Sequence, residues 1–345
     1  SPMEIWCNES QERYVMAIGT ADLQEFLDIC DRERCPVAIV GEITEGSNLK
    51  VHDTLFDNYP IDISLDTIFG NTPKTIRKFN KETKRSIKPE LIEPEISSLI
   101  KKVLRHPTVG SKGFLITIGD RSITGLISRD QMVGPWQVPV ADVAVTATTF
   151  EGITGEAMSM GERSPVALLD SPSSGRLAVA EAITNIAAAK INDLRDVKLS
   201  ANWMAASGHP GEDANLFDTV YALGMELCPG LGVCIPVGKD SMSMKTRWQA
   251  NDEAREVTSP LSVVISAFAP VTDIEDTLTA QLLPQPSQLI LIDLSAGKQR
   301  LGGSILLECC SQMGRQVPDL DQPEVLRAFF QLVQDDGFRQ HILAY

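Results

Sequence analysis

The segment 171–191 constrains the fold of this chain most strongly, because its helical pattern is apolar nearly all round. Alanine, valine and isoleucine fill most positions between 178 and 189. A helix without a broad polar face is buried inside a domain rather than laid on its surface. Any polar residue on this helix therefore needs a specific reason to be there.

Two polar residues, Glu181 and Asn185, stand four positions apart on this helix, so both side chains lie on one face. Upstream, Asp142 stands alone inside the apolar run 140–146, VADVAVT. Carboxylate and amide oxygens are the ligands that Mg²⁺ prefers. The pattern favours a magnesium–nucleotide site. The alternatives are a turn or capping aspartate at position 142 and an ordinary solvated pair on the helix.

The start of this helix, DSPSSGR (170–176), is a second candidate for ligand binding. Ser171 is expected as the N-cap, with Pro172 at the first helical position. Ser174 and Gly175 then present a hydroxyl and backbone N–H groups to an anion, because a helix N-terminus attracts phosphate. An ordinary capped helix start is the alternative.

The segment VGKDSMSMK (237–245) invites a phosphate-binding interpretation through Lys239. It is not a Walker A loop, because Asp240 follows the lysine and the glycine spacing is wrong. Lys239 at a strand end remains a candidate phosphate contact, and a turn salt bridge with Asp240 is the alternative. The chain has no nucleophile elbow, so we name no catalytic residue.

The charge balance disfavours two classes of partner. The chain has 46 acidic and 31 basic residues, a net charge of −15, which argues against nucleic-acid and anionic-membrane binding. No apolar run is long enough to span a membrane, and the start of the chain does not have the pattern of a signal peptide. Seven cysteines without a C-x-x-C pair, and four dispersed histidines, disfavour zinc and predict a reduced, cytoplasmic protein.

Short apolar runs between turn signals predict strands, and a 3.6-residue period predicts helices. We expect strands at 12–18, 35–43, 48–53, 61–65, 114–120, 136–148, 165–169, 197–205, 233–238, 261–269 and 288–294. Helices are expected near 20–30, 93–105, 171–191, 212–227 and 323–336. The abrupt start and the apolar ending HILAY suggest a piece of a larger protein.

Long blocks of the sequence resemble phosphoribosylformylglycinamidine synthase in its large, single-chain form. They are SPMEIWCNESQERYV, GDRSITGLISRDQMVGPWQVPVADVAV, GEAMSMGERSPVALLD, SGRLAVAEAITNIAAAKI, LSANWMAASGHPGEDA and PVGKDSMSMKT. The resemblance covers essentially the whole chain and implies a central piece of the synthetase region. It implies the ATP- and glutamine-dependent ligase that converts formylglycinamide ribonucleotide to formylglycinamidine ribonucleotide in purine biosynthesis.

The resemblance also implies an architecture of α/β and α+β domains like those of aminoimidazole ribonucleotide synthetase. Residues 1–80 are expected to be part of a C-terminal-type α+β domain of the first synthetase half. Residues 81–110 are expected to form a linker with one helix. Residues 111–282 are expected to be the N-terminal-type α/β domain of the second half, and 285–345 to begin its C-terminal-type partner.

Carried over residue by residue, the resemblance assigns Asp142, Glu181 and Asn185 to Mg²⁺ and Ala141 to a nucleotide contact. It implies an auxiliary site that takes ATP or ADP with magnesium and holds ADP structurally rather than turning over substrate. In the family, a further acidic ligand follows residues like Leu343–Tyr345.

The implied partners are the nucleotide and the remaining domains of the parent enzyme, including its glutaminase domain. A homodimer of this chain through apolar sheet surface is a further expectation. The alternative function, from a different class, is a catalytically inert folding and assembly module.

Overall fold

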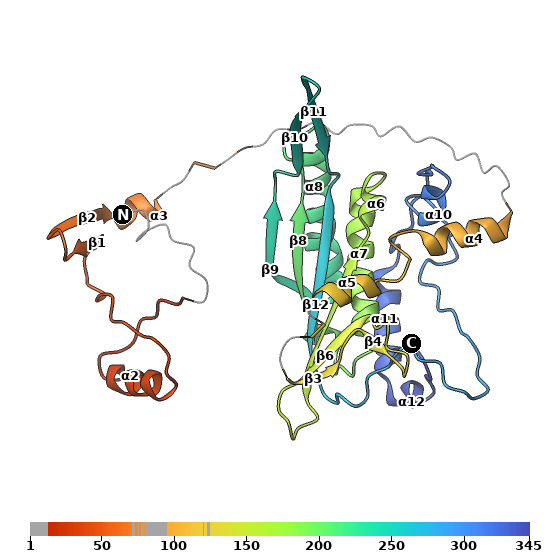
Figure 1. Cartoon of the computed structure of the whole chain (residues 1–345), viewed down its shortest axis with the longest axis horizontal. Coiled ribbons are helices and arrows are strands. Elements are labelled where there is room, and N and C mark those ends of the chain that lie inside the picture. Colours follow the sequence, from red (N-terminus) through yellow and green to blue (C-terminus); the bar gives the residue numbers. More distant parts are fainter. Residues whose placement is uncertain are drawn as a thin grey trace. The chain divides into compact units, whose positions relative to one another are not determined.

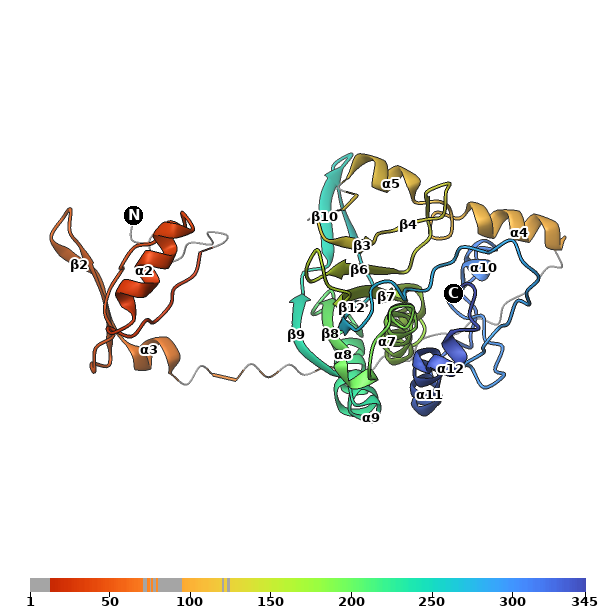
Figure 2. The same ribbon diagram turned by 90° about the horizontal axis from the view of Figure 1, so that it is seen from below.

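A computed structural model describes residues 13–70, 73, 74, 76, 79, 95–119, 121, 122 and 125–345. The chain divides into two compact units, one ending at residue 77 and the other beginning at residue 78. Figures 1 and 2 draw both units, and each is described below by itself. Within the described residues, no helix combines the length and apolar character that a membrane span requires.

The first unit contains a helix and a two-stranded hairpin. Helix α2 (Leu23–Arg32) begins after Asp22, later than the start expected near residue 20. Strands β1 (Asn48–Asp53) and β2 (Asn58–Ser64) pair antiparallel, as expected for 48–53 and 61–65. The short helix α3 (Leu65–Phe69) follows, and the hydroxyl of Ser64 accepts from the backbone N–H of Asp66 at its start.

Three expected strands, at 12–18, 35–43 and 288–294, are wrong, because the residues there form no strand. For the first of them this applies to 13–18, since residue 12 lies outside the described part. None of the three joins a ladder among the described residues. Their apolar side chains are open to solvent, with Val40 82% and Leu289 92% exposed. A strand needs a partner for its backbone N–H and C=O groups, and an apolar run does not supply one.

Two further expected strands are short helices, which corrects the prediction for 114–120 and 165–169. Residues Gly113–Ile118 form α5 and Ser164–Ala167 form α6, while residue 120 lies outside the described part. Apolar runs this short fit a strand and a helical turn equally well. Pro165 favours the helix, because it lies in the first turn, where no N–H is needed.

The second unit is built on a six-stranded sheet in the order β3-β6-β7-β12-β8-β9. Neighbouring strands are antiparallel except for the parallel pair β8–β9. The strands are β3 (Ile127–Arg129), β6 (Val143–Ala147), β7 (Gly155–Glu162), β12 (Ser262–Val271), β8 (Lys198–Met204) and β9 (Cys234–Ser241). The expected strands at 197–205, 233–238 and 261–269 are thereby confirmed.

Smaller elements complete this unit. Helix α4 (Ile96–Arg105) confirms the helix expected near 93–105, and residues 81–94 lie outside the described part. The others are β4 (Met132–Val133), β5 (Val138–Pro139), η1 (Leu194–Asp196), α8 (Glu212–Tyr221), the π-helical η2 (Ala222–Leu227), α9 (Cys228–Leu231), β10 (Lys245–Ala250), β11 (Glu253–Thr258), α10 (Ile305–Glu308), α11 (Pro323–Gln334) and α12 (Asp336–Arg339).

Helix α7 (Ser171–Ile186) is the centre of the core, as its apolar pattern predicts. It packs on β7 and β12, and α8 lies on the same side of the sheet (Figure 2). Five of its apolar side chains have no exposed surface at all: Ala178, Val179, Ala182, Ile183 and Ile186. The N-cap is Asp170, whose carboxylate accepts from Ser173 N at 2.8 Å, and not Ser171 as expected.

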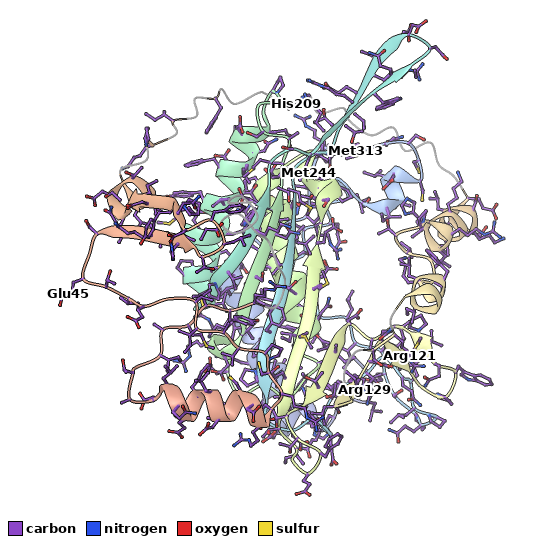
Figure 3. All side chains as sticks on the ribbon, turned by 60° about the vertical axis from the view of Figure 1, so that its left-hand side comes forward. Glu45, Arg121, Arg129, His209, Met244 and Met313 are labelled. Atoms are coloured by element: carbon purple, nitrogen blue, oxygen red, sulfur yellow. The ribbon has the colours of Figure 1, made fainter. Side chains whose placement is uncertain are left out.

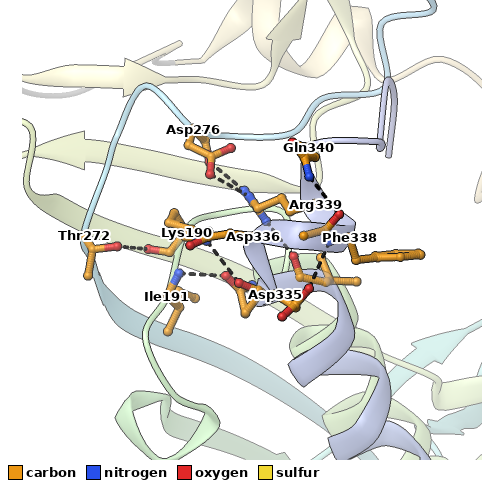
Figure 4. Close-up of polar contacts among 12 residues, drawn as sticks. Lys190, Ile191, Thr272, Asp276, Asp335, Asp336, Phe338, Arg339 and Gln340 are labelled. Carbon is orange, nitrogen blue, oxygen red and sulfur yellow. Dashed lines mark hydrogen bonds and ion pairs between the residues drawn. The ribbon is translucent and has the colours of Figure 1, made fainter.

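The C-terminal end of α7 is capped by side chains from the end of the chain, among them Arg339, which Figure 4 shows beside Asp276. The buried Arg339 guanidinium donates to the Ala187 and Ala188 carbonyls at 3.3 and 2.7 Å, and to the Asp276 carboxylate at 2.9 Å. Gln334 donates to the Ala187 carbonyl at 2.9 Å and accepts from Ile191 N at 3.0 Å. Carbonyls that a buried helix end leaves unpaired are thus satisfied.

The end of the chain therefore packs on the helices of the second unit, where α11 contacts α7, α9 and η1. Helix α11 adds four buried side chains, Leu326, Phe329, Phe330 and Val333, to the same core as α7. A domain boundary near residue 285 stays a prediction.

Replacing Arg339 by alanine is expected to lower the free energy of unfolding by about 3 kcal/mol, because carbonyls at the buried end of α7 lose their donors. Urea denaturation measures this change. Arg315→Ala, at an exposed arginine of the same segment, is the control and is expected to stay within about 0.5 kcal/mol of the parent. Equal effects of the two variants would contradict the capping role.

Candidate metal and nucleotide site

The last residues of β7 are fastened to α7 by hydrogen bonds that hold the helix close to the sheet. Ser159 Oγ donates to the Ala182 carbonyl at 2.7 Å. Gly161 lies so near the helix that an added Cβ would be 2.0 Å from the Ala178 carbonyl oxygen. The small residues of β7 therefore set the distance from which Glu181 and Asn185 reach the sheet.

Glu181 is half-buried, and both of its carboxylate oxygens have partners. Oε2 accepts from Glu162 N at 2.7 Å, and Oε1 pairs with Arg163 Nη2 at 2.9 Å. The side chain is thus held at the end of β7 with its charge balanced by Arg163. A cation placed here competes with that arginine for Oε1.

Asn185 lies one turn further along α7 on the same face. Its Nδ2 donates to the Met160 carbonyl at 2.9 Å, which turns the amide oxygen away from that carbonyl. The neighbouring Thr184 carbonyl accepts from the Tyr345 hydroxyl at 2.6 Å. The C-terminal residue therefore lies beside the part of α7 that carries Asn185.

Asp142 precedes β6 in a bend, which interrupts the continuous strand expected over 136–148 into β5 and β6. The next residue, Val143, pairs with Ser159 of β7, so Asp142 comes next to Met160 along the sheet. Asp142 is exposed, yet desolvation of its carboxylate raises its pKa. Burial, and then the Asp142 charge, raise the pKa of the Tyr345 hydroxyl.

Met160 is therefore the common neighbour of the three predicted magnesium ligands. Its carbonyl accepts from Asn185, and the backbone N–H of Glu162, two residues later, donates to Glu181. In the register of β6 and β7, Met160 lies beside Asp142. The structure brings Asp142, Glu181 and Asn185 to one region, at the end of β7 next to the C-terminus. Sequence separation alone does not reveal this, because β7 lies between them along the chain.

Ala141, the predicted nucleotide contact, is half-buried directly before Asp142. Its N–H donates to the Gln131 carbonyl at 3.2 Å, and the Gln131 side chain donates to the Arg121 carbonyl at 2.9 Å. Figure 3 shows Arg121 and Arg129 at this edge of the sheet, near β3. These contacts fix the loop in which Ala141 and Asp142 lie.

Ser174 and Gly175 are placed differently, inside the protein. The Ser174 hydroxyl donates to the Arg163 carbonyl at 2.7 Å, and a Cβ on Gly175 would lie 2.7 Å from the Thr219 side chain on α8. The negative charges at this helix start are carboxylates of the protein itself, where a bound anion was expected. Besides the Asp170 cap, Asp319 accepts from Ser173 Oγ at 3.0 Å.

Asp319 also pairs with Arg176, whose Nη2 lies 2.6 Å from a carboxylate oxygen. The pKa of the Arg176 guanidinium is raised, and the largest cause is its hydrogen bond to Asp319. The sequence reasoning missed Asp319, Arg163 and Tyr345, because each is distant in sequence or has no motif around it. The one local signal for any of the three was the position of Arg163, directly after Glu162 at the end of β7.

Lys239 is exposed on β9, opposite Asn202 of β8. Strands β7, β12 and β8 separate β9 from β6. At about 4.8 Å per strand, Lys239 lies roughly 19 Å across the sheet from the strand that follows Asp142. The structure does not bring Lys239 to the region of the three predicted ligands.

The donor set at this site is two carboxylates and one amide oxygen. Among the described residues, no group of three or more His, Cys, Asp or Glu side chains is placed to hold a metal ion. The partly desolvated Asp142 and the outward amide oxygen of Asn185 nevertheless fit a hard cation such as Mg²⁺. Glu181 fits only if Arg163 gives way at Oε1.

Two family models match the chain. Residues 111–270 match the FGAR-AT PurM_N-like domain, and residues 1–54 match the C-terminal domain of AIR synthase related protein. The predicted magnesium ligands all fall within the first match. The resemblance and the fold class predicted from the sequence are confirmed: the chain is PurL-like and is built from AIR synthase-type α/β and α+β domains.

Solved structures give weaker likenesses. Thermotoga maritima PurL complexed with ATP aligns with a TM-score of 0.48 and 15% identity, over 81% of this chain and 40% of that one. Phosphoribosylformylglycinamidine synthase II from the same organism gives 0.39 and 14%, over 70% and 34%. E. coli HypE gives 0.25 and 16%, over 54% and 45%. The assignment rests on the family models, and the chain spans two fifths or less of either synthase.

Gly161→Ala is expected to destabilise the protein by about 1–3 kcal/mol, because the added methyl group meets the backbone of α7. Chemical denaturation followed by circular dichroism measures the loss. Gly230→Ala is the matched control, since an added Cβ there meets nothing within 4 Å and alanine favours the helix. A stable Gly161→Ala protein would show that β7 and α7 are not held at this distance.

Proposed function

We propose that this chain is part of the synthetase region of a formylglycinamide ribonucleotide amidotransferase. The parent enzyme would convert formylglycinamide ribonucleotide to formylglycinamidine ribonucleotide in purine biosynthesis, with ATP as energy source and glutamine as nitrogen donor. The observation that carries the proposal is the FGAR-AT PurM_N-like match over residues 111–270, which contains the whole predicted ligand set. The order of the two matched domains along the chain supports it.

Within this chain, the proposed role is an auxiliary site for magnesium and ADP or ATP. Asp142 and Asn185 would hold the cation, with Glu181 joining when Arg163 releases Oε1. Ala141 would contact the nucleotide, because it lies in the same fixed loop as Asp142. Magnesium supplies charge neutralisation of the phosphates and fixes their geometry. Ser174, Gly175 and Lys239 are not included, because the first two contact the chain itself and Lys239 lies across the sheet.

By itself the chain is proposed to bind nucleotide without turning it over. Glu181 is engaged by Glu162 and Arg163, and the chain supplies no residue to which we assign catalysis. The nucleotide would stabilise the packing of β6, β7 and α7 against one another. The remaining domains, including a glutaminase domain, would be the partners that complete the active enzyme.

The proposal is tested by purifying the chain with Mg²⁺, denaturing it and identifying any nucleotide released. We expect ADP in near-stoichiometric amount, or binding of added ADP that depends on Mg²⁺. Asp142→Asn is expected to weaken that binding at least about tenfold, because a ligand charge is lost.

Asp240→Asn makes the same chemical change at an exposed aspartate on β9 and serves as the control. Its ADP affinity, measured by equilibrium dialysis, is expected to match that of the parent. Magnesium-dependent binding that is unaffected by Asp142→Asn would place the site elsewhere. Steady ATP hydrolysis by the isolated chain would contradict the non-catalytic role.

Two copies of this chain are proposed to associate through the sheet face opposite α7. Alternating residues of β7 and β12 face away from the helix, and Met160 and Phe268 are exposed there. The strand register places the exposed Val237 of β9 on the same face. Such a patch favours a symmetric contact with a second copy.

Phe268→Asp is expected to convert the dimer to a monomer, because it places a charge in the apolar patch. Light scattering coupled to size exclusion gives the mass directly. Glu253→Asp, on the β11 hairpin strand outside this face, is the control and should leave the dimer intact. A monomeric parent chain at high concentration would refute the proposed contact.

A further inference from the structure

The C-terminal end of α2, in the first unit, brings two cysteines together. Arg34 takes up a left-handed backbone with φ 54°, and its N–H donates to the Asp31 carbonyl at 3.0 Å. The N–H of Cys35 donates to the Cys30 carbonyl at 2.8 Å. This pair of bonds is the Schellman motif, in which the residue two beyond the helix end packs against the residue in its last turn. Cys30 and Cys35 occupy those two positions.

The two cysteines of this pair lie side by side at the helix end and differ in exposure. Cys30 is 7% exposed, and Cys35 is exposed to solvent. Burial, the neighbouring Cys35 and a hydrogen bond between the two side chains all raise the pKa of Cys30. An accessible thiol thus lies against a protected one that is able to attack it.

We propose that Cys30 and Cys35 are a redox-responsive pair that closes to a disulfide on reaction with a small-molecule disulfide. The Cys35 thiolate attacks the oxidant, forming a mixed disulfide and expelling one small thiolate. Cys30 then loses its proton and attacks the Cys35 sulfur, which forms the protein disulfide and expels the second small thiolate. The two protein thiols are oxidised, the oxidant is reduced to two thiols, and the protons from both cysteines end on them.

The motif makes this closure easy in the folded protein. A disulfide forms without backbone movement only when the two Cα atoms are about 4.4–6.8 Å apart and the Cβ atoms approach one another. The Schellman bonds already hold the two residues side by side, which is the approach that closure requires. A link that opens and closes is the form expected of a disulfide in a reducing compartment.

A second cysteine pair, Cys228 and Cys234, lies at a similar helix end but is spaced one residue too far apart, and it serves as a comparison. At the end of α9, Gly232 is left-handed with φ 76° and Val233 N donates to the Cys228 carbonyl at 3.1 Å. The motif is the same, but Val233 occupies the position next to Cys228, and Cys234 follows one residue later. Burial and then Cys234 raise the pKa of Cys228 to about 11. The pKa of the buried cysteine is thus raised in both pairs, and the two pairs differ in the position of the second cysteine relative to the turn.

The test is to treat the native chain with oxidised glutathione, quench with acid and an alkylating reagent, and map the peptides by mass spectrometry. We expect a Cys30–Cys35 link to form first, at least about tenfold faster than a Cys228–Cys234 link, and to open again with excess reduced glutathione. In denaturant the two rates should approach each other, because the loops differ by one residue.

Two variants sharpen the result. Cys35→Ser is expected to leave the buried Cys30 unmodified, and Cys234→Ser is expected to leave the Cys30–Cys35 rate unchanged. Equal rates for the two pairs in the native protein would overturn the proposal. So would a lasting glutathione adduct on Cys35 with Cys30 still reduced.

Discussion

The structure of the second unit depends on satisfying the polar groups of one buried helix. Helix α7 lies inside the domain, where each unpaired backbone group would be costly. Its start is capped by Asp170, its middle is fastened to β7, and its end is capped by Arg339. Segments that precede and follow α7 in the sequence thus pack against this one helix, because each supplies hydrogen-bond partners where water has no access.

This requirement also explains where the candidate site lies. A buried helix leaves few places for charged or amide side chains, and Glu181 and Asn185 occupy the face that meets the end of β7. There the backbone of β7 offers the Glu162 N–H and the Met160 carbonyl as partners. Asp142 joins them because β6 pairs with β7. The three predicted magnesium ligands therefore lie near one another because of how the helix and the two strands are held together.

Sequence patterns predicted well those elements that carry their own burial signal. Helix α7, strands β8 and β12, and helix α11 were expected because their apolar residues repeat with a clear period or fill a long run. Short runs failed, as at 165–169, since a few apolar residues do not distinguish a strand from a helical turn. The run at 288–294 failed for another reason, because strand formation needs a partner that lies elsewhere.

The sequence by itself determined that α7 is buried, that its polar pair is exceptional, and which family the chain resembles. These follow from local composition and from motifs, which do not depend on distant contacts. Only the tertiary structure decided that Ser174 and Gly175 face the protein interior and that Arg163 and Tyr345 adjoin the site. Neighbours of this kind are fixed by strand order and helix packing, which join residues far apart in the chain and leave no periodic trace within it.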